Sequence, residues 1–250
     1  MVRRALLTLL IALVSLPAAA TPAPTPPKPS LRVLFIGNSL TSWHNLPAYA
    51  ASLARQTGDT TFRYRMIAPP AVALEDHWRI PRTRSALAEQ RWDVVVMQQG
   101  PSAEPETRVH LCTWTKRFAD LARSRGAKPR LLMVWSAGRF GLQEVIDSYA
   151  AAAAAADAPA LPAGVAWAAA WKRKPGLALH ARDGLHPSRL GTYLAALVVY
   201  AGLRDVSPLT LPSSVVVARK RFTVSRQNAQ ILRAAAAEAL ALPVPAPACG

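Results

Sequence analysis

The sequence predicts an α/β domain in which helices cover a parallel sheet, and three observations support this class. The chain has 250 residues, of which 51% are apolar and 18% charged, so one large domain with a sizeable core is expected. Short runs of β-branched and other apolar residues alternate with longer amphipathic or Ala-rich stretches, as strands alternate with covering helices in such domains. The two cysteines are too few for a disulfide scaffold or a cysteine-based zinc site, which excludes those small-domain classes.

Five runs are expected to form strands. The first of them is almost continuously apolar and stops at Gly37, as expected for a strand that is buried on both faces. The predicted strands are residues 32–36, 61–67, 93–97, 130–135 and a shorter one at 165–167. Helices are predicted at residues 46–56, 106–124, 142–156, 188–201 and 234–242. Trp135, Trp167 and Trp171 are expected in or near the core rather than on a sugar-binding platform.

The N-terminus has the features of an export signal. In residues 1–20, Arg3 and Arg4 precede an apolar stretch that is too short to span a bilayer comfortably, and small residues up to Ala20 supply a cleavage site. We expect cleavage after Ala20. No later apolar stretch is long enough to hold the chain in a membrane, so the sequence predicts a secreted or periplasmic protein with no integral membrane span after cleavage.

The rest of the chain is expected to form one domain between two Pro-rich segments. A Pro-rich spacer at 21–30 leads into the domain at 31–242, and a Pro-rich tail at 243–250 is expected to be loose. Export would place the two cysteines, Cys112 and Cys249, in a compartment that permits a disulfide. The sequence leaves that bond undecided, because it does not give their distance.

The strong positive charge of the chain could indicate a polyanionic partner such as a nucleic acid. Lys and Arg total 30 against 14 Asp and Glu, which gives a net charge of +16. The basic residues are scattered along the chain, and it carries no helix-turn-helix, zinc-finger or RNA-binding signature. We therefore predict no nucleic-acid partner, while attraction to acidic envelope polymers stays open.

Polar residues that could carry chemistry follow the first predicted strand. The segment from Gly37 to Thr41 reads Gly-Asn-Ser-Leu-Thr and lies where the strand should turn into a helix. At such a turn Ser39 can expose its hydroxyl and use its own backbone N–H as an oxyanion donor. The alternative is that Asn38, Ser39 and Thr41 only cap the helix. Trp43 and His44 follow closely and could form the rim of a pocket.

A second polar segment lies directly before the last predicted core helix. Asp183 and His186 are three residues apart in Asp-Gly-Leu-His-Pro, so that one turn can hold both side chains. A serine hydroxyl needs a base to take its proton, and the base needs an acceptor that fixes its tautomer. The alternative is an exposed helix-start Asp beside a surface His. The combination with the Ser39 segment in a parallel sheet favours a catalytic triad.

These segments resemble the conserved blocks of the SGNH, or GDSL-like, hydrolases. Residues 35–41 (FIGNSLT) resemble the first block and residues 183–196 (DGLHPSRLGTYLAA) the final Asp-x-x-His block, while residues 97–102 (MQQGPS) stand where the family has Gly-x-Asn-Asp. The resemblance covers most of residues 31–203. It implies a flavodoxin-like three-layer α/β/α sandwich with a central parallel sheet and a Ser-Asp-His hydrolase. The implied nucleophile is Ser39, the general base and acid is His186, and Asp183 orients that histidine.

The chain departs from the family pattern in the second and third blocks. Prolines and Ala71 replace the usual Gly, and Gln98 and Gln99 occupy the region of the usual Asn. Proline has no N–H to donate, so the predicted oxyanion donors are the backbone N–H groups of Ser39 and Ala71 and the side chain of Gln98, with Gln99 as second choice.

Three residues are expected to contact the substrate, although each also has a simpler explanation. They are Asn38, Gln99 and His77. Asn38 could instead hold the first turn, Gln99 could provide ordinary turn polarity, and His77 could lie on a surface helix. The histidines show no metal-ligand spacing and no phosphate-binding glycine loop follows the first strand, so neither a metal nor another cofactor is predicted.

The sequence thus predicts an exported serine esterase that acts on small-molecule or carbohydrate esters. Short acyl groups, in particular O-acetyl groups on polysaccharides, are the expected substrates, with lipid-like esters second. Two alternatives stay open. The same triad would serve an acyltransferase that acts on envelope glycans, and the altered blocks would suit a catalytically weak carbohydrate-binding protein with the same fold.

Overall fold

The computed structural model describes residues 29–89, 91–137 and 140–250, so the predicted signal peptide and nearly all of the spacer lie outside the described residues. Five strands form the main sheet and two more form a hairpin. The main strands are β1 (Leu31–Ile36), β2 (Phe62–Ile67), β3 (Val94–Met97), β4 (Lys128–Met133) and β5 (Ala160–Pro162), and the hairpin strands are β6 (Ser214–Val217) and β7 (Lys220–Thr223). The helices are α1 (Ser39–Ser42), α2 (Leu46–Gln56), α3 (Leu74–Arg79), α4 (Pro81–Glu89), α5 (Pro105–Ser124), α6 (Leu142–Ala155), α7 (Ala163–Arg173), α8 (Arg189–Arg204) and α9 (Arg226–Ala241), with a 3-10 turn η1 (Pro208–Thr210).

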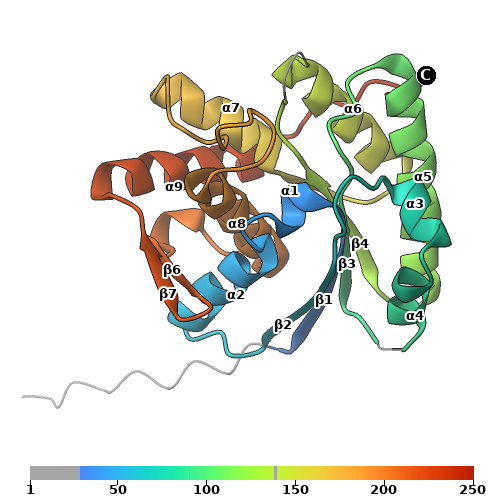
Figure 1. The fold of residues 1–250 in the computed structure, drawn as a ribbon, viewed down its shortest axis with the longest axis horizontal. Helices are drawn as coiled ribbons and strands as arrows, with labels where there is room; N and C mark the ends of the chain where they lie inside the picture. The colour runs from blue at the N-terminus through green and yellow to red at the C-terminus, as the bar shows by residue number, and fades with distance from the viewer. Residues whose placement is uncertain (1–28, 90, 138–139) are drawn as a thin grey trace, which may run out of the picture.

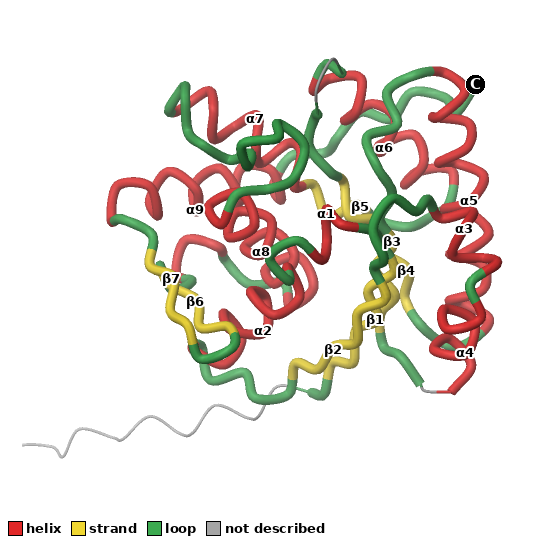
Figure 2. Tube along the Cα trace, viewed as in Figure 1, coloured by secondary structure: helices red, strands yellow, loops and turns green. Residues whose placement is uncertain are grey.

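The main sheet is wholly parallel, with the strand order β2-β1-β3-β4-β5. Helices α3, α4, α5 and α6 lie on one side of it and α2, α7, α8 and α9 on the other (Figure 1). Figure 2 shows the strands side by side between these two helical layers. The three-layer α/β/α sandwich predicted from the sequence is therefore confirmed. In this strand order the chain reverses direction across the sheet at β1 and β3, where ligands of open α/β sheets bind.

The strands match the buried runs that the sequence predicts. Val33, Leu34 and Phe35 of β1 are at most 1% exposed, because both faces of the central strands are covered by helices. The predicted strands at 32–36, 61–67, 93–97 and 130–135 are confirmed with small shifts at their ends.

The fifth strand is shifted from its predicted place. Residues 165–167 lie within helix α7, and the strand is formed by Ala160–Pro162 just before it. A three-residue apolar run does not distinguish a strand from a buried helix, and the neighbouring alanines favour helix. Trp167 is fully buried and stacks on Trp135 at a centroid distance of 4.2 Å, so the core position predicted for these two rings is confirmed.

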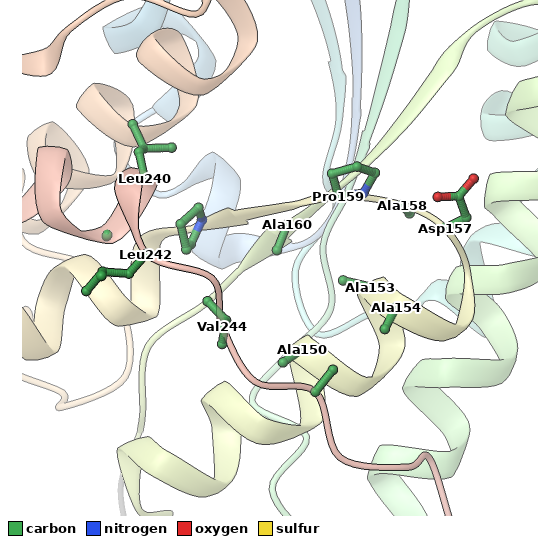
Figure 3. Close-up of a pocket in the computed structure, with 13 residues that line it drawn as sticks. Ala150, Ala153, Ala154, Asp157, Ala158, Pro159, Ala160, Leu240, Leu242 and Val244 are labelled. Atoms are coloured by element: carbon green, nitrogen blue, oxygen red, sulfur yellow. The ribbon is translucent and has the colours of Figure 1, made fainter.

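The C-terminal part also differs from the prediction. The β6–β7 hairpin was not expected, and α9 begins well before the predicted 234–242 helix. A disulfide joins Cys112 of α5 to Cys249, so the tail is fastened to the domain rather than loose. Val244 of the tail lines a cavity of about 350 Å³ together with Leu242, which follows α9, and Ala150 of α6 (Figure 3).

Removing this disulfide is expected to lower the stability of the protein. The bond joins residues 137 apart and so closes a long loop in the unfolded chain. We expect Cys249→Ser to lower the free energy of unfolding by roughly 2–5 kcal/mol. Urea unfolding of both proteins, without and with a thiol reductant, measures the difference. The reductant should bring the wild type to the level of the variant, and equal midpoints of the two oxidised proteins would contradict the prediction.

Candidate active site

Ser39 lies in a tight turn at the carboxyl end of β1. Asn38 is the N-cap of α1 and accepts a hydrogen bond from the backbone N–H of Leu40 (3.1 Å), so Ser39 is the first helical residue. Ser39 is half-buried between two buried neighbours. A Cβ on Gly37 would come within 2.5 Å of Gln98 Oε1, so any larger residue at this strand end would displace the amide of Gln98.

Asp183 and His186 form a hydrogen-bonded pair in the loop before α8. Nδ1 of His186 donates to Oδ2 of Asp183 (2.8 Å). The other carboxylate oxygen accepts the backbone N–H groups of Leu185 and His186, both at 2.9 Å. These hydrogen bonds, that of Leu185 first, lower the pKa of Asp183 to about 2. The carboxylate therefore stays ionised at neutral pH and leaves Nε2 of His186 as the basic nitrogen.

Two side chains anchor this loop to the end of β4. The indole N–H of Trp135 donates to the carbonyl of Leu185 (3.1 Å), and Nε2 of His180 donates to the carbonyl of Ser136 (2.8 Å). A β-bridge between His180 and Pro187 closes the loop. This role of His180 could not be predicted, because no motif in the neighbouring sequence marks the residue as an anchor.

Trp43 connects His186 to the short helix that begins at Ser39. Its ring stacks on the imidazole of His186 with a centroid distance of 4.1 Å and an interplanar angle of 17°. The backbone N–H of Trp43 donates to the carbonyl of Ser39 (2.8 Å), so the two residues are one helical turn apart on the same face. His186 thus lies on the side of α1 that carries Ser39. No hydrogen bond joins Ser39 Oγ to His186 in the part of the chain that the structure describes.

Gln98 forms the centre of a buried hydrogen-bond network that ties β3 to the Ser39 turn. Its Oε1 accepts from the backbone N–H of Asn38 (2.9 Å) and from Oγ1 of Thr41 (2.8 Å). Its Nε2 donates to Oδ1 of Asn38 (2.9 Å) and to the carbonyl of Gln99. The predicted role of Gln98 as an oxyanion donor needs correction, because both amide hydrogens already have protein acceptors. Gln98 positions the nucleophile turn instead.

Asn38 links the same turn to the loop that carries Ala71. Nδ2 of Asn38 donates to the carbonyl of Val72 (3.0 Å), and the residue is only 7% exposed. The substrate contact predicted for Asn38 is therefore corrected: the side chain holds the Ser39 turn by hydrogen bonds, which is the alternative that the sequence left open. Ala71 is exposed and has a φ of 57°. Within the described ranges, the backbone N–H groups of Ser39 and Ala71 have no protein acceptor.

His77 is inside the protein and cannot contact a substrate in this structure. It is fully buried, its Nε2 donates to the carbonyl of Gly37 (2.7 Å), and its Nδ1 lies 2.9 Å from Oγ1 of Thr83. The substrate contact predicted for His77 is thus wrong. The side chain instead holds the end of β1 through its hydrogen bond to Gly37. Burial lowers its pKa below the ordinary value, so the folded protein holds it neutral.

Gln99 is likewise structural. Its Oε1 accepts from the backbone N–H of Leu74 (3.0 Å), and its Nε2 donates to Oγ of Ser102 (3.1 Å) and lies 3.3 Å from Nδ1 of His110. The side chain is buried, so the predicted substrate contact of Gln99 is also corrected. It fastens the start of α3 to the loop after β3.

The buried His77 predicts a pH-dependent stability. Its pKa is lowered in the folded state from the ordinary 6.5, so the unfolded chain takes up the proton first as the pH falls. The contribution of neutral His77 to the free energy of unfolding is complete above pH 6.5. It declines below that pH by at most about 1.4 kcal/mol per pH unit. His77→Gln should show a shallower decline in urea unfolding free energy. Parallel curves for wild type and His77→Gln would exclude this role.

No group of three or more His, Cys, Asp and Glu residues in the described ranges could hold a metal ion. Nor does that part of the chain contain a helix long and apolar enough to cross a membrane.

No family model and no curated protein matches the chain. Solved structures do. A candidate SGNH hydrolase from Slackia heliotrinireducens is 27% identical with a TM-score of 0.60 and covers 70% of this chain and 100% of its own. A DUF4886 family protein from Bacteroides uniformis is 19% identical with a TM-score of 0.68 and covers 88% of this chain and 98% of its own. An acetyl xylan esterase is 15% identical with a TM-score of 0.53 and covers 69% of this chain and 100% of its own. The chain has the SGNH hydrolase fold.

Proposed function

We propose that this protein is an exported serine esterase with Ser39 as nucleophile, His186 as general base and acid, and Asp183 as the group that orients His186. The observation that carries the proposal is the Asp183–His186 hydrogen bond of 2.8 Å in a loop that Trp43 holds against the Ser39 turn. The fold shared with a candidate SGNH hydrolase supports a hydrolytic reaction.

The proposed reaction begins at Ser39. His186 Nε2 takes the hydroxyl proton as Ser39 Oγ attacks the ester carbonyl carbon, and the Asp183 carboxylate stabilises the resulting imidazolium. The tetrahedral oxyanion accepts hydrogen bonds from the backbone N–H groups of Ser39 and Ala71. His186 then gives the proton to the departing alkoxide, which leaves an acyl-enzyme. A water molecule, deprotonated by His186, then attacks the acyl-enzyme and forms a second tetrahedral intermediate. As its bond to Ser39 Oγ breaks, His186 returns the proton to Oγ, which releases the acid and restores Ser39.

Short acyl esters, in particular O-acetyl groups on carbohydrates, are the proposed substrates. The fold is shared with an acetyl xylan esterase, which supports this choice. Export is supported by the N-terminal sequence and by the Cys112–Cys249 disulfide, because such bonds persist in oxidising compartments.

One observation favours the second candidate, a catalytically weak carbohydrate-binding protein. Gln98 donates both amide hydrogens within the protein, so the oxyanion site relies on two backbone donors. Loss of one oxyanion donor costs on the order of 10²–10³ in kcat in a serine protease. An acyltransferase uses the same triad, and a product that depends on an added sugar acceptor would identify it.

Turnover of p-nitrophenyl acetate by the purified mature chain, beside acetate release from acetylated glycans, tests the proposal. The esterase account expects multiple turnovers and free acetate without an acceptor. A protein that binds glycans but releases no acetate would favour the second candidate.

A further inference from the structure

A small pocket lined by positive charges lies beside the proposed triad. It has a volume of about 160 Å³ and is formed where the segment before α2, the first residue of α8 and the β6–β7 hairpin meet. Its lining residues are His44, Tyr49, Arg189, Val215, Val217, Lys220, Arg221 and Phe222.

The pocket has three cationic side chains and no carboxylate. Arg189, Lys220 and Arg221 line it, and none of them has an ion pair within the described ranges. Arg221 donates only to Oγ of Ser214 (3.0 Å) among the side-chain contacts described. Unpaired cations that share one concave site attract an anion more strongly than scattered surface charges do.

This charge is held close to the reacting groups. His44 directly follows Trp43, whose ring stacks on His186, and Arg189 comes three residues after His186 in the sequence. The charge of Arg189 also adds to burial in lowering the pKa of His44, which agrees with their closeness. The pocket therefore shares its walls with the two chain segments that carry Trp43 and His186.

The hairpin that carries two of the cations is firmly attached to α2, beside which it lies in Figure 1. The backbone N–H of Val216 donates to Oγ of Ser52 (2.7 Å), and Nε2 of Gln56 donates to the carbonyl of Ser214 (2.8 Å). Phe222 packs on Tyr49 with a centroid distance of 6.3 Å. A fixed hairpin can hold charges in place for a ligand without a large ordering cost.

A second basic cavity shows what distinguishes this one. Arg123, Lys128 and Arg130 line a cavity near the start of β4, at the opposite end of the strands from Ser39. That cavity includes Asp157, and Arg123 pairs with Asp120 (3.0 Å). Only the pocket at Arg189 combines unpaired cations with a place beside the triad, in the part of the chain that the structure describes.

We propose that this pocket binds a carboxylate of the substrate, so that the preferred substrates are short acyl esters of acidic carbohydrates. The proposal rests on the esterase function above. A guanidinium beside an ammonium suits a sugar carboxylate, because the planar fork of arginine can bind both of its oxygens. The excess of Lys and Arg over Asp and Glu along the chain would draw such a polymer toward the protein.

The test compares one acetylated pectin with its carboxylates free and the same polymer with them methyl-esterified. Wild type should release acetate from the free-acid form with the higher kcat/KM. Arg189→Gln should reduce that preference on the order of tenfold, because it removes a charged hydrogen-bond donor. Arg226→Gln is the matched control, since Arg226 is exposed, begins helix α9 as Arg189 begins α8, and lies outside the pocket. The proposal would be overturned if wild type had the same kcat/KM for both polymers. It would also be overturned if Arg189→Gln and Arg226→Gln reduced the preference for the free-acid polymer equally.

A binding measurement separates this inference from the esterase function. Calorimetric titration with an unacetylated galacturonate oligomer requires no catalysis. The inference expects binding that Arg189→Gln and Lys220→Gln weaken about tenfold and Arg226→Gln does not. Such binding without any ester turnover would contradict the esterase alone, whereas turnover without such binding would contradict the pocket alone. Tighter binding of a sulfated oligomer of equal length would overturn the choice of a carboxylate.

Discussion

Ser39→Ala is expected to lower kcat/KM for p-nitrophenyl acetate by on the order of 10⁴-fold or more, because no other group on the chain would form the acyl-enzyme. The hydroxyl of Ser39 has no hydrogen-bond partner within the described ranges, so its removal should leave the fold intact. Thermal unfolding of the variant should therefore match that of wild type. Together, the two measurements separate a lost nucleophile from a lost fold.

Ser42→Ala is the matched control for this prediction. Ser42 ends the same short helix α1 and is also partly exposed. Its loss should change kcat/KM by no more than a few-fold. If Ser39→Ala kept turnover within a few-fold of wild type, the nucleophile would be another group and the proposed mechanism would fail.

Asp183→Asn is expected to lower kcat by up to about 10⁴-fold, the size of effect known from the corresponding change in a serine protease. One carboxylate oxygen accepts two backbone N–H groups, so the amide oxygen of Asn must take that place. The amide nitrogen would then face Nδ1 of His186 and donate to it. This favours the tautomer with the proton on Nε2, and the imidazole can no longer take a proton from Ser39.

The control for this change is Asp205→Asn. Asp205 is exposed and caps the C-terminus of α8 with a φ of 51°, a conformation that Asn also tolerates. Its substitution should leave kcat unchanged. Equal kcat values for Asp183→Asn and Asp205→Asn would show that the Asp183–His186 hydrogen bond has no catalytic role.

The sheet, the Ser39 turn and the Asp183–His186 loop could be predicted from the sequence because each has a local signal. Buried parallel strands are continuously apolar, and β1 and β3 show this directly. Ser39 and the Asp183–His186 pair follow apolar runs or precede a helix, where parallel sheets gather polar groups. The short β5 has no such signal, since its length does not distinguish strand from helix.

The roles of the supporting residues could not be predicted, because they depend on contacts between distant segments. Gln98 looks like any polar residue after a strand, and only its approach to Gly37 and Asn38 engages both ends of its amide. His77 has polar neighbours in sequence, yet it is buried under the Ser39 turn. A polar residue at a strand end can thus build the site without touching the substrate.

Covalent labelling with a fluorophosphonate is the most direct test of the central claim that Ser39 is an activated nucleophile. The reagent bonds to a serine only when a neighbouring base activates it. Peptide mass mapping should find a single label on Ser39 in the wild type, no label in Ser39→Ala, and much slower labelling in His186→Ala. A label on another serine, or a wild type that hydrolyses esters but takes up no label on Ser39, would contradict the account.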